Sequence, residues 1–181
     1  MTKKDIREKI IKKRLLLKNS TVKEKTTKAF GNFLAANLPL GANILLYLPI
    51  KKEVGTVDFF DFYLREGANI FLPKYEDGSW GIAKFTGYDD LENGPFGTLQ
   101  PKANLAIRDK IDLAIVPGVA FCRSGIRIGF GKGIYDMILP KLKAFIVGLC
   151  YDFQIVDDVE KEEHDVLVDI VISESEILKI T

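Results

Sequence analysis

The stretch ILLYLPIKKEVGTVDFFDFYLREGANIFL, residues 44–72, decides the fold class of this chain. Residues 44–48 form a short apolar run that ends at Pro49, as expected of a strand buried on both faces of a sheet. Thr56 can cap a helix that continues to Gly67, and a second apolar strand, residues 70–72, is predicted to stop at Pro73. Strand, helix and strand in so short a cycle are typical of parallel α/β units.

The rest of the chain extends this pattern. Further apolar runs lie at residues 111–116, 145–149 and 169–172, and residues 74–104 indicate a hairpin around residues 80–85 followed by a long loop. Residues 1–37 read as two helices separated by residues 19–20, because residues 2–5 and 21–24 both have capping-box spacing. No repeat or linker divides the chain. We therefore predict one three-layer α/β/α domain over residues 1–181, with a mainly parallel central sheet, two N-terminal helices and a small hairpin insertion.

Composition limits the class of protein. Of 181 residues, 47% are hydrophobic and 28% charged, which excludes disordered, collagen-like and disulfide-framework proteins. No apolar run reaches the roughly 18 residues of a membrane-spanning helix, so we expect no membrane partner. Cys122 and Cys150 lie far apart without a CxxC pairing, which predicts a reducing, cytoplasmic location.

The scarcity of histidine limits the chemistry. His164 is the single histidine, so no zinc site with several His and Cys ligands can be assembled. A Ser-His-Asp triad would need His164 itself, and we assign it no role. Catalysis must therefore rest on carboxylates, lysine, arginine, backbone amides and a hard metal ion.

Charge is distributed unevenly along the chain. Residues 1–28 hold eleven Lys and Arg against three acids, whereas the remaining residues hold fifteen basic and twenty-two acidic ones. The basic segment fits an anion-binding arm, a nucleic-acid-binding module or a solvated helix surface. Because its basic residues are spread around both helices and aromatic residues are scarce among them, we expect no nucleic-acid partner.

The most informative segment for chemistry is residues 116–139. A strand ends at Val116, a loop carries Arg127 and the run Gly129-Phe-Gly-Lys-Gly133, and a helical pattern begins at Ile134. Alternate glycines beside lysine and arginine at the start of a helix predict a phosphate cradle, since backbone amides can then approach an anion. A glycine-rich turn that merely crosses the sheet edge remains the alternative, because the run does not match the Walker pattern. Asp136 fits either a helix cap or a Mg²⁺ ligand.

The run Arg127-x-Gly129-x-Gly131-Lys132-Gly133-x-Tyr135-Asp136 resembles the nucleotide loop of the 5-formyltetrahydrofolate cyclo-ligase family, also called 5,10-methenyltetrahydrofolate synthetases. Other segments resemble that family in order along nearly the whole chain, and they are Lys3-x-x-x-Arg7 (with Lys4 as the alternative lysine), Tyr47-x-Pro49, Glu53-Val54-Gly55-Thr56, Gly94-Pro95-Phe96-Gly97, Val116–Phe121, Gly148–Gln154, His164-Asp165 and Val168-Asp169. Ile134 departs from the pattern, as does the absence of a proline just before His164.

The resemblance implies ATP-dependent cyclisation of 5-formyltetrahydrofolate to 5,10-methenyltetrahydrofolate, through a phosphorylated formyl (iminium phosphate) intermediate. It implies that Lys132 and Arg127 are catalytic and that Mg²⁺ is held by Asp136 and Asp165, with Asp169 as the alternative to Asp165. The ATP-binding residues it implies are Lys3, Arg7, Arg127, Gly129, Gly131, Lys132, Gly133, Ile134, Tyr135 and Asp136. The folate-binding residues it implies are Tyr47, Glu53, Gly131, Lys132, Gly133 and Tyr135. ATP and the folate are the expected partners of a monomeric enzyme.

Other functions fit the same scaffold, because a fold does not determine an activity. A sugar-phosphate isomerase or coenzyme A transferase is one alternative. A nucleotide sensor that keeps the glycine loop but performs no reaction is another. Dependence of product formation on ATP and Mg²⁺ separates these possibilities.

Overall fold

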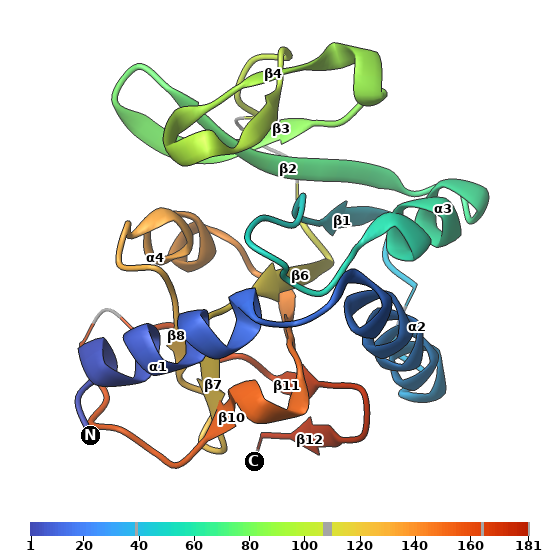
Figure 1. The fold of residues 1–181 in the computed structure, drawn as a ribbon. Coiled ribbons are helices and arrows are strands. Elements are labelled where there is room, and N and C mark those ends of the chain that lie inside the picture. Colours follow the sequence, from blue (N-terminus) through green and yellow to red (C-terminus); the bar gives the residue numbers. More distant parts are fainter. Residues whose placement is uncertain (39, 107–109, 164, 181) are drawn as a thin grey trace.

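The structure is a computed structural model that describes residues 1–38, 40–106, 110–163 and 165–180. In this part of the chain, seven strands form one sheet in the order β12-β11-β9-β6-β1-β2-β3 (Figure 1). The edge strands β3 (Ser79–Lys84) and β12 (Ile177–Lys179) are antiparallel to their neighbours. The central strands run parallel, and they are β1 (Asn43–Leu45), β2 (Asn69–Glu76), β6 (Leu113–Pro117), β9 (Phe145–Leu149) and β11 (Ile170–Ile172). The predicted α/β class with a mainly parallel sheet is confirmed.

Both predicted N-terminal helices are present, as α1 (Lys3–Leu15) and α2 (Asn19–Ala35). Thr2 caps α1 through reciprocal hydrogen bonds with Asp5, as their spacing predicts. The prediction for the second helix is wrong in two respects: α2 begins at Asn19, so residues 19–20 separate nothing, and residues 21–24 lie inside the helix. The turn between the helices lies earlier because the ammonium of Lys52, on a distant loop, donates hydrogen bonds to the carbonyls of Leu15 and Leu17.

The remaining elements are short. α3 (Val57–Arg65) connects β1 to β2, and α4 (Ile134–Ile138) precedes β9. β7 (Ala120–Cys122), β8 (Arg127–Ile128) and β10 (Ile155–Val156) form a small second sheet, and β4 (Leu91–Asn93) pairs with β5 (Leu99–Pro101). Single helical turns are η1 (Tyr88–Asp90), η2 (Pro95–Gly97), η3 (Leu139–Lys141) and η4 (Asp152–Gln154). His164 lies outside the described residues.

The strand predicted over residues 70–72 does not stop at Pro73. β2 continues to Glu76 and pairs antiparallel with β3, with Pro73 opposite Ile82, which forms the predicted hairpin. Proline is tolerated there because β1 pairs with β2 only as far as Phe71, so the missing N–H interrupts no ladder to β1. The extended hairpin projects at the top of Figure 1, where β4 and β5 lie beside it.

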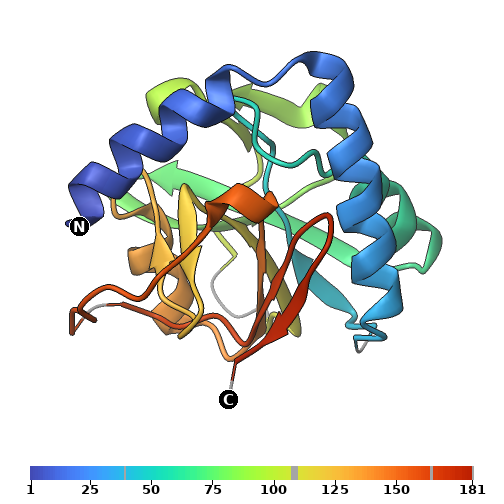
Figure 2. The same cartoon turned by 60° about the horizontal axis from the view of Figure 1, so that its bottom comes forward.

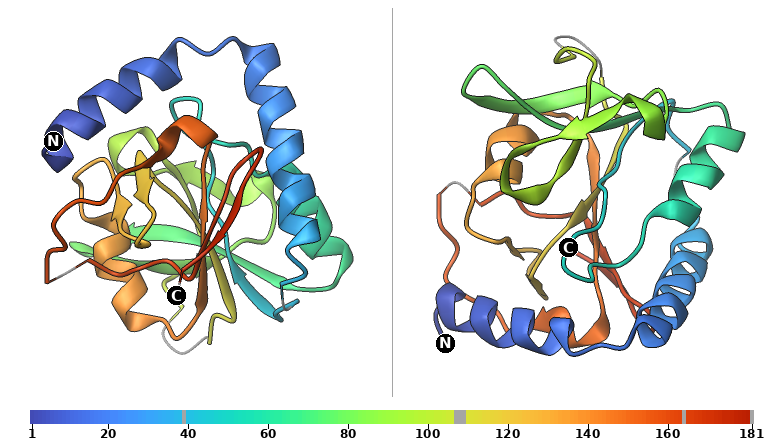
Figure 3. Two further views of the ribbon diagram at one scale, coloured as in Figure 1. Left: turned by 90° about the horizontal axis from the view of Figure 1, so that it is seen from below. Right: turned by 45° about the horizontal axis from the view of Figure 1, so that its top comes forward.

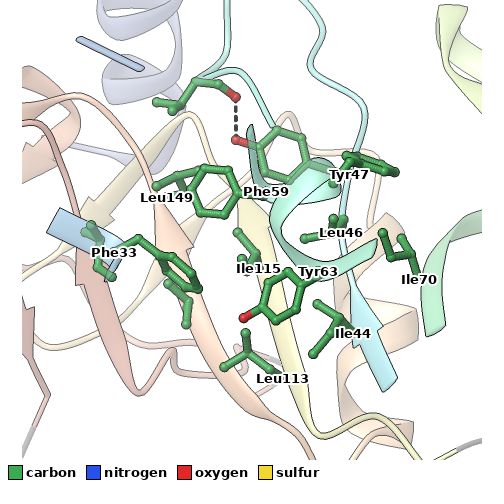
Figure 4. Packing of buried hydrophobic residues seen from close by; sticks show 14 of the residues in the cluster. Phe33, Ile44, Leu46, Tyr47, Phe59, Tyr63, Ile70, Leu113, Ile115 and Leu149 are labelled. Carbon is green, nitrogen blue, oxygen red and sulfur yellow. Dashed lines mark hydrogen bonds between the residues drawn. The ribbon is translucent and has the colours of Figure 1, made fainter. Parts of the chain in front are cut away.

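Apolar side chains cover both faces of the central sheet. Ile44 and Leu46 belong to a cluster with Phe33 of α2 and Phe59 of α3, and Figure 4 shows these side chains packed together. Leu45, between them in sequence, belongs to a second cluster with side chains of α4. Alternate residues along an extended chain point to opposite faces, so the apolar run is buried on both sides, as predicted. The strand itself is shorter than predicted, because β1 ends at Leu45.

The order of the strands determines where a ligand can bind. Within the sheet, β2 lies on one side of β1 and β6 lies on the other. The strand order therefore changes direction between β1 and β6, and the carboxyl ends of these two strands border the switch point. Such switch points are the usual ligand sites of open α/β sheets. α1 packs Ile6 and Ile10 against the β7–β8 sheet, and Figures 2 and 3 show α1 and α2 along two sides of the domain. No helix in the described ranges is long and apolar enough to cross a membrane.

Gly148 in β9 supports a stability prediction. It is buried, and a Cβ atom at this position would overlap the ring of Phe121, which is fully buried on β7. We expect Gly148→Ala to lower the free energy of unfolding by about 1–3 kcal/mol, because a well-packed core accommodates an added methyl group only with strain. Urea denaturation followed by circular dichroism measures this loss.

Gly31→Ala is the matched control for that substitution. Gly31 is exposed in α2, and a Cβ there would meet no atom of the described residues within 4 Å. It should raise stability by about 0.5–1 kcal/mol, since alanine is a better helix former than glycine. Equal stabilities of the wild type and Gly148→Ala would show that Phe121 can move aside without cost.

Candidate functional site

A cleft of about 360 Å³ lies at the switch point of the sheet. The chain after β1 contributes Tyr47, the last residue of β6 is Pro117, and the turn that follows contributes Gly118. All the site residues predicted from the sequence line this one cleft, and they are Lys3, Arg7, Tyr47, Glu53, Arg127, Gly129, Gly131, Lys132, Gly133, Ile134, Tyr135, Asp136 and Asp165. Folding therefore brings together residues that span most of the chain.

The glycine loop between β8 and α4 forms one wall of the cleft. Gly131 and Gly133 have φ angles of 80° and 67°, a left-handed conformation that glycine adopts without steric cost. Any side chain at position 129 would collide with the guanidinium of Arg127. The glycines thus allow a sharp turn and close packing on Arg127. α4 has only five residues, so its dipole adds little to the attraction of the loop for an anion.

Arg127 is a buried cation at the base of this loop. Only 9% of the residue is exposed, and its Nη2 donates a 2.7 Å hydrogen bond to Oδ1 of Asp136. Its guanidinium also lies 5.1 Å from the ring centre of Tyr135. Burial lowers the pKa of Arg127 from its usual value, while Asp136 and Tyr135 act in the opposite direction. The guanidinium remains charged at neutral pH because an arginine side chain titrates far above it.

Lys132 faces the cleft from the tip of the loop. Its Nζ lies 4.8 Å from the ring centre of Phe96, which belongs to η2 beyond the hairpin. Phe96 and Trp80 both line the cleft, although neither was among the predicted site residues. Nothing in the local pattern around Phe96 or Trp80 indicates a cleft, because the fold of the insertion alone brings them there.

The first helix brings two cations to the cleft. Nζ of Lys3 lies 2.7 Å from Oδ2 of Asp165 and 3.0 Å from Oε2 of Glu162. Burial alone would lower the pKa of Lys3, but the hydrogen bonds and charges of these two acids raise it overall. Nε of Arg7 donates a 2.8 Å hydrogen bond to the carbonyl of Gly129. The structure thus places Lys3, and not the exposed Lys4, in the cleft.

Asp136 and Asp165 are the two predicted metal ligands, and both line the cleft. Each is paired with a cation, Asp136 with Arg127 and Asp165 with Lys3. Asp169 is elsewhere: it precedes β11, accepts a 2.6 Å hydrogen bond from the amide of Ile146 and is not among the lining residues.

These carboxylates fit Mg²⁺ better than a metal that needs a complete protein cage. The described residues contain no cluster of three or more His, Cys, Asp or Glu side chains suited to a metal. Mg²⁺ is commonly held by one or two carboxylates together with water and substrate phosphates. Asp136 and Asp165 meet that requirement in a cleft that is also rich in cations.

Glu53 and Tyr47 occupy the part of the cleft next to β1. Tyr47 is held from two sides, since its hydroxyl donates to the carbonyl of Val54 (Figure 4) and its own carbonyl accepts from the hydroxyl of Thr56. Thr56 precedes α3 as predicted, but its hydroxyl serves Tyr47 instead of the helix amides. Only 4% of Glu53 is exposed, and its Oε2 accepts a 2.9 Å hydrogen bond from the amide of Ile50. Burial raises the pKa of Glu53 to about 7, against the effects of the Ile50 amide and nearby cations.

Comparisons with known proteins identify relatives of this chain. Residues 1–174 match the 5-formyltetrahydrofolate cyclo-ligase family. The 5-formyltetrahydrofolate cyclo-ligase of Mycoplasma pneumoniae is 31% identical over 180 residues, which cover 96% of this chain and 99% of that protein. The solved structure of 5,10-methenyltetrahydrofolate synthetase from Aquifex aeolicus superposes with a TM-score of 0.85 at 31% identity, covering 99% of this chain and 93% of that one. A solved 5,10-methenyltetrahydrofolate synthetase from Mycoplasma pneumoniae gives 0.78 at 28% identity, covering 97% of this chain and 100% of that one.

Proposed function

This chain belongs to the 5-formyltetrahydrofolate cyclo-ligase family, and we propose that it converts 5-formyltetrahydrofolate and ATP into 5,10-methenyltetrahydrofolate, ADP and phosphate. One observation carries the proposal: a single cleft combines a basic glycine loop suited to a triphosphate with a buried carboxylate suited to a pterin. The reaction needs both kinds of site, because a formamide oxygen is a poor leaving group until it is phosphorylated.

In the proposed reaction, the formyl oxygen attacks the γ-phosphorus of ATP and the bond from that phosphorus to the β-γ bridging oxygen breaks. ADP leaves, and the formyl carbon becomes an iminium phosphate. N10 then attacks this carbon and loses its proton, and the phosphate departs with the former formyl oxygen. Catalysis of such a transfer rests mainly on positioning and charge neutralisation, which explains why no histidine is required.

The basic residues of the cleft would neutralise the triphosphate. Lys132, at the tip of the loop, is suited to the γ-phosphate, and Arg127 is suited to a phosphate oxygen beside Asp136. Lys3 and Arg7 would bind from α1, and the loop from Gly129 to Asp136, including Ile134 and Tyr135, would surround the nucleotide. Mg²⁺ held by Asp136 and Asp165 would supply further positive charge to the phosphate oxygens.

The other part of the cleft suits the folate. The carboxylate of Glu53 would accept hydrogen bonds from N–H groups of the pterin. The backbone carbonyl of Glu53 accepts a 3.2 Å hydrogen bond from the hydroxyl of Tyr151. Tyr135 and Tyr47 present aromatic surface to the same space. A planar heterocycle can stack on such side chains while its polar edge reaches Glu53.

The experiment that tests this function follows the absorbance of the methenyl product with purified protein. Product should form only when 5-formyltetrahydrofolate, ATP and Mg²⁺ are all present, and one ADP should appear for each product. Absence of an ATP-dependent signal from folded protein would overturn the proposal. ATP binding without turnover would indicate a nucleotide sensor, and transfer activity without ATP would indicate an isomerase or coenzyme A transferase.

Folate binding should depend on the protonation of Glu53. Because burial raises the pKa of Glu53 to about 7, the charged acceptor form becomes dominant only as the pH rises through this value. We therefore expect the KM for 5-formyltetrahydrofolate to fall between pH 6 and pH 8, a range chosen around that pKa of about 7. Glu53→Gln should raise the KM about tenfold or more, in keeping with loss of a hydrogen bond to a charged group, and should abolish this pH dependence.

Glu66→Gln is the matched control, since Glu66 is an exposed acid at the end of α3. Glu66→Gln should leave the folate KM and its pH dependence unchanged.

The stability of the wild-type protein should decrease with pH over the range in which folate binding improves. The folded protein binds a proton at Glu53 more tightly than the unfolded chain does, so stability should fall as pH rises from about 4.5 to about 7. A pH-independent folate KM in the wild type would contradict the role of Glu53.

Two further expectations concern the setting of the enzyme. Cys122 and Cys150 are both free and buried, which supports a cytoplasmic location.

We also propose that the enzyme acts as a monomer, because the residues of the proposed site all come from one chain. Light scattering at assay concentrations measures the oligomeric state.

A further inference from the structure

Arg14 is a fully buried arginine that the proposed reaction does not use. It lies near the end of α1, and none of its surface is exposed. Its Nε donates a 3.0 Å hydrogen bond to the carbonyl of Lys51, and its Nη1 donates a 3.1 Å hydrogen bond to the carbonyl of Gly118. Lys51 and Gly118 both line the cleft, on the loops after β1 and β6. Arg14 therefore connects α1 to both loops at the switch point.

The third nitrogen of this guanidinium faces Glu53. Nη2 of Arg14 lies 3.8 Å from Oε1 of Glu53, and it has no hydrogen-bond partner in the described part of the chain. A buried guanidinium nitrogen without an acceptor is costly, and the attraction of a nearby carboxylate offsets part of that cost. Among the residues that the structure describes, the one carboxylate paired with it is that of Glu53, which also lines the cleft.

We propose that Arg14 is a positioning residue, which stabilises the ionised form of the Glu53 carboxylate and holds it aimed into the cleft for the pterin of the folate. The proposal rests on the proposed function for the identity of this ligand. Arg14 itself is not among the residues that line the cleft, so it acts through Glu53. The charge of a buried neighbour at this distance favours the ionised form of a carboxyl group.

The other groups that face Glu53 cannot supply this charge equally well. They come from its own loop, the chain after β1, α4 and the chain after β9, and they are Lys51, Tyr47, Tyr135 and Tyr151. Burial raises the pKa of all three tyrosines, which leaves their hydroxyls uncharged at neutral pH. Lys51 is exposed, so solvent screens its charge far more than that of Arg14.

Lys52 also anchors this loop to α1, so the effect of the anchor can be tested apart from the effect of the Arg14 charge. Lys51 and Lys52 both have left-handed backbones, with φ angles of 47° and 57°, so this turn is held in an unfavourable conformation. Lys52 binds the end of α1 through a 2.8 Å hydrogen bond to the carbonyl of Leu15 and another to that of Leu17. Lys52→Gln would weaken the anchor without removing the cation beside Glu53.

The first test measures the titration of Glu53 directly. Protein labelled with ¹³C at glutamate side-chain carboxyl groups is titrated by NMR, with Glu53→Gln used to assign the signal. Arg14→Gln should move the midpoint to higher pH by at least one pH unit, a tenfold change in proton affinity. Arg14→Lys and Lys52→Gln should stay within about half a pH unit of the wild type, because both retain a cation beside Glu53. An unmoved midpoint in folded Arg14→Gln would overturn the proposal.

The second test measures binding. Trp80 is the single tryptophan and lines the cleft, so its fluorescence can report bound 5-formyltetrahydrofolate. Arg14→Gln should weaken folate binding at least tenfold at pH 7, while the KM for ATP changes less than threefold. Lys52→Gln should lower stability and leave the pH dependence of folate binding unchanged. An equal loss for folate and ATP would show that Arg14 only holds α1 in place.

Two further outcomes keep the proposal falsifiable. If Arg14→Gln does not fold, Arg14→Lys replaces it as the test. Arg14→Lys keeps the charge but loses the forked contacts to Lys51 and Gly118, so folate binding should weaken at least fivefold. Unchanged folate binding in this variant would overturn the positioning role. If wild-type protein forms no methenyl product, the proposed function fails. The NMR titration still tests the effect of Arg14 on Glu53, because it requires no turnover.

Discussion

Replacing Lys132 by alanine should lower kcat by about 10²–10³ at saturating ATP and folate, as expected when one group that stabilises transition-state charge is removed. The physical reason is the place of Lys132 at the tip of the glycine loop, where its ammonium faces the cleft and contacts the protein through the ring of Phe96. A charge held so loosely in the free enzyme is available to a phosphate. Initial rates of methenyl formation at several ATP concentrations measure the effect.

Two controls define the role of Lys132. Lys132→Arg keeps the charge and should recover part of kcat, whereas Lys12→Ala removes an exposed lysine of α1 and should leave kcat unchanged. Stability should be the same in all three variants, because Lys132 is exposed. Wild-type kcat in Lys132→Ala would show that the assigned role is wrong. A rise in the KM for ATP alone would restrict Lys132 to binding.

Replacing Arg127 by methionine should affect both activity and stability. The substitution removes a buried cation from its 2.7 Å pair with Asp136 and leaves that carboxylate without its partner. Loss of one member of a buried pair costs about 3–5 kcal/mol, and the partial exposure of Asp136 reduces this to about 2 kcal/mol. The proposed contact to phosphate is lost as well, so kcat/KM for ATP should fall by at least about 10², the scale of one lost charge-stabilising group.

A double-mutant cycle separates these effects. Asp136→Asn in the Arg127→Met background removes the unpaired charge and should restore part of the stability, but not the activity. Arg123→Met is the matched control, because Arg123 forms a 2.9 Å ion pair with Glu176 on the surface. It should change neither property measurably, since solvent screens exposed pairs. Full activity in Arg127→Met would remove Arg127 from the catalytic residues.

Local sequence patterns predicted the strands and the glycine loop well. The run at residues 145–149 coincides with β9, and the run at residues 44–48 begins on β1, which ends at Leu45. Continuous apolar stretches of this kind are favoured where both faces of a sheet are covered. The glycine loop lies between a strand and a helix, as predicted, and Gly131 and Gly133 have the left-handed conformation that glycine allows. Each of these signals lies within a few residues of the feature it predicts.

The errors arose where distant contacts override a local signal. The spacing of Thr21 and Glu24 predicts a helix start, but α2 begins earlier, at Asn19. The ammonium of Lys52 binds the carbonyls of Leu15 and Leu17, which fixes the turn just before it. Pro73 predicts the end of a strand, yet β3 provides a partner that carries β2 onward. In both cases tertiary structure supplied hydrogen bonds that the local pattern does not contain.

The sequence by itself determined the fold class and the family resemblance, because each depends on local patterns and on their order along the chain. It also predicts a phosphate cradle at the glycine loop, from residues close together in the chain. Only the tertiary structure decided which lysine and which aspartate enter the cleft, since Lys3 and Asp165 meet across almost the whole chain. It alone brought Trp80 and Phe96 to the cleft and Arg14 to Glu53. Such contacts depend on how β1, β6 and α1 pack together, and no periodicity or spacing records that packing.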